Sequence, residues 1–205
     1  MTIILIITTT LISLITFNRP EIDSRLQFNA YRIWHGKEQY RMISHGFIHA
    51  DYMHLIINML VLYSFGTNVE FYFNRMWMQG MIRFPQLYYL LMYLAAIVIS
   101  SLLTLFKQRD NPHYNAVGAS GAVSAVLFTS IFFAPLDKVY FFFYLPVPGI
   151  VFAILYLVYS QYMSRRNVDN INHDAHFVGA VFGFVFPLLI DVRLIYHFLA
   201  QLGLR

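Results

Sequence analysis

Four polar side chains lie within otherwise apolar stretches of the chain, and their chemical types suit nucleophilic catalysis. They are His54, Asn58, Ser120 and His176. A serine hydroxyl becomes a good nucleophile only when a base removes its proton, and neutral histidine is the usual base near neutral pH. Ser120 and His176 therefore form a candidate nucleophile and base.

Attack on an amide carbonyl builds an oxyanion, which needs preorganised hydrogen-bond donors. His54 and Asn58 are four residues apart and would share one face of a helix. Together with the backbone N–H of Ser120, they are the candidate oxyanion donors. No metal ligand set or cofactor motif accompanies these residues, so we expect neither a metal nor a cofactor.

Small residues flank both members of the candidate pair. Gly179 and Gly183 form a G-x-x-x-G face that permits close approach of two helices. The small residues next to the serine are Gly118, Gly121, Ala122 and Ala125. A serine and a histidine on separate helices reach each other only if the backbones nearly touch, so these residues are predicted to support the site.

Membrane-spanning helices are the elements that must position these groups. The chain of 205 residues is 59% hydrophobic and 12% charged, against about 45–50% and about 25% in an ordinary soluble domain. Helices of about 20 apolar residues span a membrane. We expect an all-α polytopic membrane protein, a single domain over 1–205, with six spans at approximately 1–17, 54–73, 84–106, 115–134, 139–161 and 175–191.

The segments between the spans differ in length. Residues 18–53 form a long loop, expected to lie in the membrane interface as short amphipathic helices and turns. The first span lacks the features of a cleaved signal peptide and is interpreted as a retained helix. The stretch 193–205 is either a helix extension or an interfacial tail. The net charge of +4 and the absence of cysteine give no sign of nucleic-acid binding, disulfides or thiolate chemistry.

Alternating helix direction brings the four polar residues to one depth. The second, fourth and sixth spans all begin at the same membrane face, and each polar residue lies within about two turns of such a beginning. This convergence favours catalysis over isolated packing roles. Charge counting opposes a cytoplasmic N-terminus, because that orientation places nine Lys or Arg outside and five inside.

At these positions the sequence resembles the rhomboid family of intramembrane serine proteases. The motifs are H-x-x-x-N at His54 and Asn58, G-x-S-G over 118–121, and A-H-x-x-G over 175–179, in that order. Arg41 in the first loop and Glu70 in the second span match supporting features of the family. The resemblance covers nearly the whole chain, as the compact six-helix form.

The resemblance implies a Ser120–His176 dyad that cuts transmembrane segments of membrane proteins near the outer face. It also implies oxyanion roles for His54 and Asn58, a cytoplasmic N-terminus in a plasma or inner membrane, and a loop over 162–174 that caps the site. We adopt this orientation on the resemblance. The oligomeric state and the physiological substrate stay open.

Two positions depart from the family pattern. Many members carry a tyrosine four residues after the serine, stacked on the histidine, where this chain has Ser124. What orients His176 is therefore open. The Trp-Arg pair of the family's first loop is Tyr40-Arg41 here. No acidic third member is evident, because Asp174 need not face the His176 ring.

Three other functions compete with proteolysis. The first is a non-catalytic rhomboid-like protein that binds or chaperones transmembrane helices, although such proteins typically lack the serine or the histidine. The second is a metal site built by His45, His49 and His54, which lacks a carboxylate partner. The third is a proton relay using His176 and Asp191, which are too far apart on one helix to pair.

Overall fold

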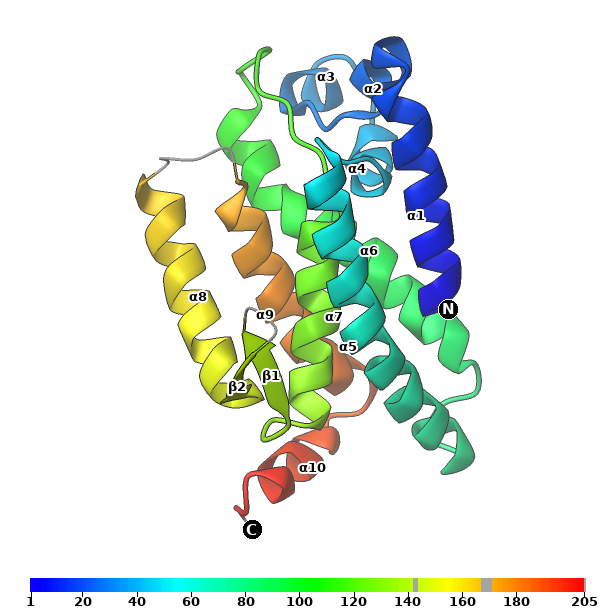
Figure 1. Ribbon diagram of the computed structural model, residues 1–205, viewed down its shortest axis with the longest axis vertical. Coiled ribbons are helices and arrows are strands. Elements are labelled where there is room, and N and C mark those ends of the chain that lie inside the picture. The colour runs from blue at the N-terminus through cyan, green and yellow to red at the C-terminus, as the bar shows by residue number, and fades with distance from the viewer. Residues whose placement is uncertain (142–143, 167–170, 205) are drawn as a thin grey trace.

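The computed structural model describes residues 1–141, 144–166 and 171–204. Figure 1 shows a bundle of long helices with short helices at both ends. The elements are α1 (Thr2–Phe17), α2 (Pro20–Leu26), α3 (Ala30–Trp34), α4 (Arg41–Ser44), the 3-10 helix η1 (His45–Phe47), α5 (Tyr52–Met78), α6 (Pro85–Gln108), α7 (Ser120–Phe133), β1 (Lys138–Phe141), β2 (Leu145–Pro148), α8 (Gly149–Arg166), α9 (His173–Ile190) and α10 (Leu194–Gln201).

The central element is α7, which is buried on every side. All its residues from Gly121 to Phe133 are buried, and α5, α6 and α9 pack around it. A helix that is apolar all round has no face for solvent or headgroups, so the middle of the bundle is where it is stable. The outer helices bury one stripe each and leave large apolar side chains exposed.

Helix directions alternate as predicted. In Figure 1, α5, α7 and α9 all begin toward the upper end and run downward, whereas α6 and α8 run upward. The segments carrying His54, Ser120 and His176 therefore start toward the same end of the molecule. The first loop, with α2, α3 and α4, covers that end.

Specific caps fix where two of these helices begin. Asp51 precedes α5, and its carboxylate accepts the His54 N–H at 2.7 Å. Asn172 precedes α9, and its side-chain oxygen accepts the Ala175 N–H at 3.1 Å. Such caps satisfy backbone donors that have no partner inside the helix. They place His54 and His176 in the first turn of their helices.

Two predicted helix starts are wrong. The span expected over 139–161 begins with an antiparallel hairpin, in which Lys138 pairs with Pro148, and α8 starts only at Gly149. Pro146 and Pro148 lack an N–H and favour extended backbone before them, which excludes a helix there. The span expected over 115–134 begins at Ser120, because the first loop holds the preceding segment in an extended form.

The loop expected over 162–174 is shorter than predicted. Helix α8 continues to Arg166 and α9 starts at His173, and 167–170 lie outside the described residues, as does Arg205. The C-terminal stretch contains a separate helix, α10, after a turn at Asp191. Of the two alternatives for this stretch, a continuous extension of α9 is therefore wrong, and a distinct short helix follows the turn.

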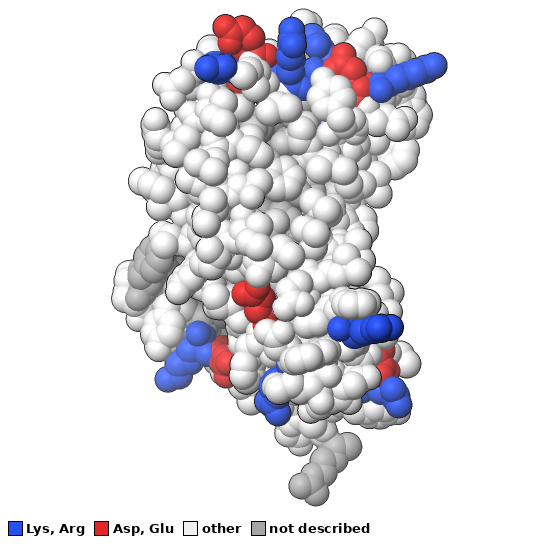
Figure 2. Space-filling view, turned by 90° about the vertical axis from the view of Figure 1, so that its right-hand side faces the viewer, with Lys and Arg blue, Asp and Glu red and all other residues white. Residues whose placement is uncertain are grey.

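Two helices in the described part of the chain, α6 and α9, are long and apolar enough to cross a membrane. The helices α1 and α7 are apolar but shorter. Figure 2 shows Lys, Arg, Asp and Glu gathered toward the two ends of the molecule, with a broad uncharged band between and one acidic patch near the lower edge of that band. Such a band matches the hydrocarbon layer of a bilayer.

Candidate active site

Ser120 is the first residue of α7, not one turn inside it as the sequence suggested. The first N–H groups of a helix have no intrahelical acceptor, and the helix dipole makes this end electropositive. The Ser120 N–H is therefore available to a ligand, which one further turn of helix before it would have prevented. The side chain is half-buried.

Helix α7, which begins at Ser120, is short. Its 14 residues span about 21 Å, less than the roughly 30 Å of a bilayer core. The residues before it, 109–119, are irregular backbone. Such backbone is tolerated only where protein groups or water satisfy its polar atoms.

The long first loop satisfies that backbone. Phe28 and Ala116 exchange two hydrogen bonds, at 2.9 and 3.0 Å. The Gly118 N–H donates to the His45 carbonyl oxygen at 3.0 Å. The Ala119 N–H points at the His49 Nε2 over 3.5 Å. The segment predicted to lie in the interface thus also supports the backbone that precedes the candidate nucleophile.

His49 links this loop to α1. Its Nδ1 lies 3.0 Å from Ser13 Oγ, and the Ser13 hydroxyl donates to the Phe47 carbonyl oxygen at 3.1 Å. Burial, aided by His54, lowers the pKa of His49 to about 3. The ring is therefore neutral, with Nε2 accepting from Ala119 and the proton on Nδ1. Both nitrogens are used by the protein and neither is available to a metal.

His54 packs against the backbone of the same loop. Gly118 has a φ of +118°, and a Cβ placed there would lie 2.6 Å from His54 Cε1. Only glycine allows both the backbone angle and the contact. The His54 ring is therefore held two residues before Ser120. Its other neighbour is the His49 ring, edge-on at 5.0 Å.

Asn58 is buried one turn further along α5, with 6% of its surface exposed. One N–H of its amide donates to the His54 carbonyl oxygen at 2.9 Å. A side-chain amide has two such donors, so one remains for a ligand. The sequence prediction that His54 and Asn58 lie on one helix is confirmed by α5.

The histidine end of the site is fixed by polar bonds between helices. Asn172, which caps α9, also donates to Thr104 Oγ1 on α6 at 2.9 Å. The Asp174 carboxylate accepts from Lys107 Nζ at 2.7 Å and from Ser164 Oγ at 2.5 Å. Asp174 thus ties α6, α8 and α9 together just before His176.

The backbones of α7 and α9 touch beside the candidate pair. A Cβ at Gly179 would overlap the Gly121 carbonyl oxygen, and one at Gly183 would overlap the backbone of Ala125. Gly121 follows Ser120 directly, and Gly179 lies one turn after His176. At both glycines the two helix backbones are in contact, which only residues without a side chain allow.

Ser120 lines a cavity of about 30 Å³ whose wall also includes His45 and Ser100. Among the described residues the Ser120 hydroxyl makes no hydrogen bond, so it is free to turn; in ligand-free structures such bonds often form only with substrate. His45 is buried and its ring nitrogens have no hydrogen-bond partner. Burial lowers its pKa to about 4, which keeps it neutral.

The His176 ring lies against Tyr156 of α8. The two ring centroids are 6.4 Å apart and the planes differ by 21°. Sequence reasoning missed this residue, because its position on another helix gives no signal at a fixed spacing from Ser120 or His176. The ring of His173 meets His176 edge-on at 5.9 Å.

Arg41 and Glu70, the two predicted supporting residues that lie away from the contact between α7 and α9, each connect separate segments of the fold. Arg41 is 1% exposed; its guanidinium binds Glu38 at 2.5 Å and donates to the carbonyl oxygens of Ser24 and Gln27 at 2.9 and 2.8 Å. It therefore ties α4 to α2 within the first loop. Glu70 accepts the Thr2 N–H at 3.1 Å and joins α5 to α1.

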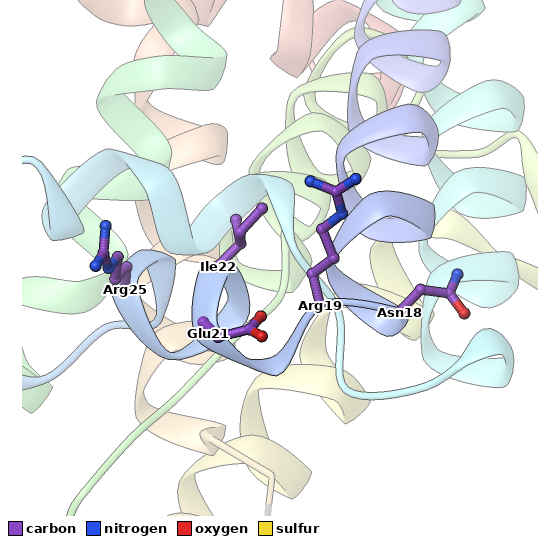
Figure 3. A pocket seen from close by; sticks show the side chains of 5 residues that line it. All are labelled: Asn18, Arg19, Glu21, Ile22 and Arg25. Carbon is purple, nitrogen blue, oxygen red and sulfur yellow. The ribbon is translucent and has the colours of Figure 1, made fainter.

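The competing sites gain no support. No group of three His, Cys, Asp or Glu in the described ranges is placed to hold a metal. Asp191 ends α9 and pairs with Arg193 at 2.7 Å, far along the helix from His176. A larger cavity of about 430 Å³ at the α1–α2 junction is lined by Asn18, Arg19, Glu21, Ile22 and Arg25 (Figure 3). It is open and shares no residue with the cavity at Ser120.

Fold and site together define a helical protein with two helices apolar enough to cross a membrane, in which Ser120 starts a short central helix and His176 lies in the first turn of the helix packed against it. Residues 36–192 match the family model of the Rhomboid domain. The chain belongs to the rhomboid family, and the resemblance predicted from its motifs is confirmed.

Two curated relatives agree with this assignment. The chain is 29% identical over 154 residues to RHOMBOID-like protein 12, mitochondrial, of Arabidopsis thaliana, which covers 68% of this chain and 43% of that protein. It is 27% identical over 168 residues to Rhomboid-related protein 1 of Caenorhabditis elegans, which covers 78% of this chain and 42% of that protein. The matched part spans less than half the length of either relative.

Proposed function

We propose that this chain is an intramembrane serine endopeptidase with a Ser120–His176 dyad. The observation that carries the proposal is the backbone contact between Gly121 and Gly179. It brings the start of α7 next to the start of α9, where the nucleophile and the base lie. Ser120 also starts α7, where its backbone N–H has no intrahelical acceptor and can donate to a ligand.

The proposed reaction follows from these groups. His176 takes the proton of Ser120 as Oγ attacks the substrate carbonyl carbon. The resulting oxyanion accepts hydrogen bonds from the Ser120 N–H, the His54 ring and the remaining N–H of Asn58. The C–N bond breaks as His176 returns the proton to the leaving amine. Water, with its proton taken by His176, then hydrolyses the acyl-enzyme.

The proposed membrane arrangement has six spans, formed by α1, α5, α6, α7, α8 and α9. The N-terminus is cytoplasmic and the first loop faces outside, in a plasma or inner membrane. The name of the Arabidopsis relative describes it as mitochondrial. The same arrangement of spans would fit the inner membrane of an organelle. The short α7 supports this proposal, because it leaves Ser120 below the outer surface within reach of water.

The proposed substrates are transmembrane segments of other membrane proteins. A helical amide is already hydrogen-bonded, so the segment must unwind before Ser120 can attack. Small or helix-breaking residues near its outer end should favour cleavage. Entry between α5 and α8 fits the packing, because both helices present large apolar side chains outward, such as Ile57 and Leu155.

The test uses the full chain in proteoliposomes with a fluorescent transmembrane reporter. We expect the native chain to cleave the reporter and to react with a fluorophosphonate at residue 120. Ser120→Ala and His176→Ala should abolish cleavage while inserting and folding normally. Cleavage by Ser120→Ala at the native rate would overturn the proposal. Reporter binding without cleavage or labelling by the native chain would instead favour a non-catalytic helix-binding protein.

A further inference from the structure

Tyr156 connects the candidate base to the helix that carries the candidate nucleophile. It projects from α8 and is half-buried between α7 and α9. Its ring stacks on His176 at 6.4 Å and 21°. Its Oη is hydrogen-bonded to Ser124 Oγ of α7 at 2.6 Å.

The contacts on α7 clamp the tyrosine from two sides. Ser124 lies four residues after Ser120, and Phe128 lies four residues after Ser124, so all three share one face of the helix. Phe128 packs against the Tyr156 ring at 5.4 Å with a 57° tilt. A stacked ring alone can slide across its partner, whereas a ring fixed by a hydrogen bond and a second aromatic contact cannot.

We propose that Tyr156 is a positioning residue for His176, and that Ser124 fixes Tyr156 to α7. This inference rests on the proposed function, in which His176 is the base. The position four residues after the nucleophile carries no ring in this chain, but its small hydroxyl leaves room for a ring from α8 and anchors it. The orientations of the base and of the nucleophile therefore both depend on α7, which carries Ser120 and holds the ring that stacks on His176.

Because the Tyr156 ring comes from α8, this helix takes part in orienting His176. In Figure 1, α8 lies at the edge of the bundle, beside α9. Three elements then share the task of orienting the base: α9 carries it, α8 supplies the aromatic face, and α7 holds that face in place. A displacement of α8 away from α7 would break the bond between Tyr156 and Ser124 and release the His176 ring.

The experiment compares variants of the full chain by kcat, KM and fluorophosphonate labelling. Tyr156→Leu removes the ring, and we expect kcat to fall by about tenfold to a hundredfold at unchanged KM, since a general base contributes roughly 10²–10⁴. Tyr156→Phe keeps the ring and loses the hydrogen bond, so a fall of only about two- to tenfold is expected. Ser124→Ala should match it, and the double variant should be no worse than either single one.

Leu157→Ala is the matched control. Leu157 is the next residue of α8 and packs against the same cluster of buried side chains, but it has no ring to stack. We expect it to lower the thermal midpoint without lowering kcat. Equal losses of kcat in Tyr156→Leu and Leu157→Ala, or an unchanged kcat in Tyr156→Leu, would overturn the inference.

A second measurement does not depend on activity. A stacked tyrosine shifts the ring proton signals of His176 upfield in an NMR spectrum. Tyr156→Leu should move these signals downfield, whereas Leu157→Ala should leave them in place. If the native chain neither cleaves the reporter nor reacts with the fluorophosphonate, the proposed function is wrong. If it does both but the His176 ring signals do not change in Tyr156→Leu, only the positioning role of Tyr156 is wrong.

Discussion

At the scale of single residues, the position of Ser120 decides which of its groups can act. As the first residue of α7 it combines a hydroxyl with a backbone N–H that has no intrahelical acceptor, and it lines a small cavity. His54 is held next to this point by its contact with Gly118, and Asn58 keeps one N–H unused. These groups are the candidate donors to an oxyanion.

The first prediction concerns these donors. We expect His54→Ala and Asn58→Ala each to lower kcat by about 10²–10³ with little change in KM, because an oxyanion exists only in the transition state. Reporter cleavage at saturating substrate measures this. Ser64→Ala is the matched control on α5, because its hydroxyl only bonds to a carbonyl of its own helix. Native kcat in both donor variants would contradict the assignment.

At the scale of elements, the contact between α7 and α9 is the one that the site depends on. Small residues on both helices remove the side chains that would separate the backbones. The Gly121 carbonyl oxygen occupies the space that a Cβ at Gly179 would need. Backbone atoms cannot move aside as a flexible side chain can, so any substitution must shift one helix.

A second prediction follows for Gly179→Ala. We expect it to destabilise the fold by about 1–3 kcal/mol through overpacking, and to lower kcat further because Ser120 and His176 move apart. Thermal unfolding and reporter cleavage measure the two effects. Val181→Leu is the control, since Val181 lies on the same helix with 40% of its surface exposed. Full activity in Gly179→Ala would show that the close contact is dispensable.

The first loop is the second decisive element, because it holds the segment before Ser120 through His45 and His49. Burial keeps the pKa of His45 at about 4, below its ordinary value of 6.5. In the unfolded chain this histidine takes a proton near pH 6.5, whereas in the folded chain it does not until about pH 4. Stability should therefore fall as the pH drops from about 6.5 toward 4.

This pH dependence is the third prediction. We expect the thermal midpoint in detergent to decrease between pH 7 and pH 5, above the range where carboxylates titrate. His45→Gln should show a shallower decrease, and His49, whose pKa is lowered in the same direction, contributes to what remains. Parallel decreases in the native chain and His45→Gln would mean that His45 does not contribute.

At the scale of the whole molecule, charge is separated from the apolar surface. On the face shown in Figure 2, charged side chains gather toward the two ends and leave a broad uncharged band between them, with one acidic patch near its lower edge. The first loop lies at one end and α10 at the other (Figure 1). Both ends are polar, and the two arguments for orientation disagree: the charge count opposes a cytoplasmic N-terminus, whereas the family resemblance implies one.

Cysteine labelling decides the orientation, and it is the fourth prediction. The chain has no cysteine, so a single introduced one is the only reactive thiol. We expect a membrane-impermeant maleimide to label Arg25→Cys in intact cells and Tyr196→Cys only after permeabilisation. The native chain is the unlabelled control. The reverse pattern would place the first loop and the site on the cytoplasmic side.

Much of the molecule could be predicted from the order of residue types along the chain. Apolar runs predict helices wherever local hydrogen bonding must satisfy the backbone, and alternating direction placed His54, Ser120 and His176 toward one end. The predictions failed at 139–148, where prolines disfavour a helix, and at 115–119. There the deciding contacts come from Phe28, His45 and His49, which are distant in sequence and leave no local pattern.

The sequence by itself determined the family, the helical membrane class and the candidate pair, because these depend on composition and on motifs with fixed spacing. Only the tertiary structure decided that Ser120 begins its helix, that the first loop supports the backbone before it, and that Tyr156 lies on His176. Each of these depends on contacts between segments far apart in the chain. Such contacts depend on how the helices and loops pack in three dimensions, and the spacing of residues along the chain does not reveal them.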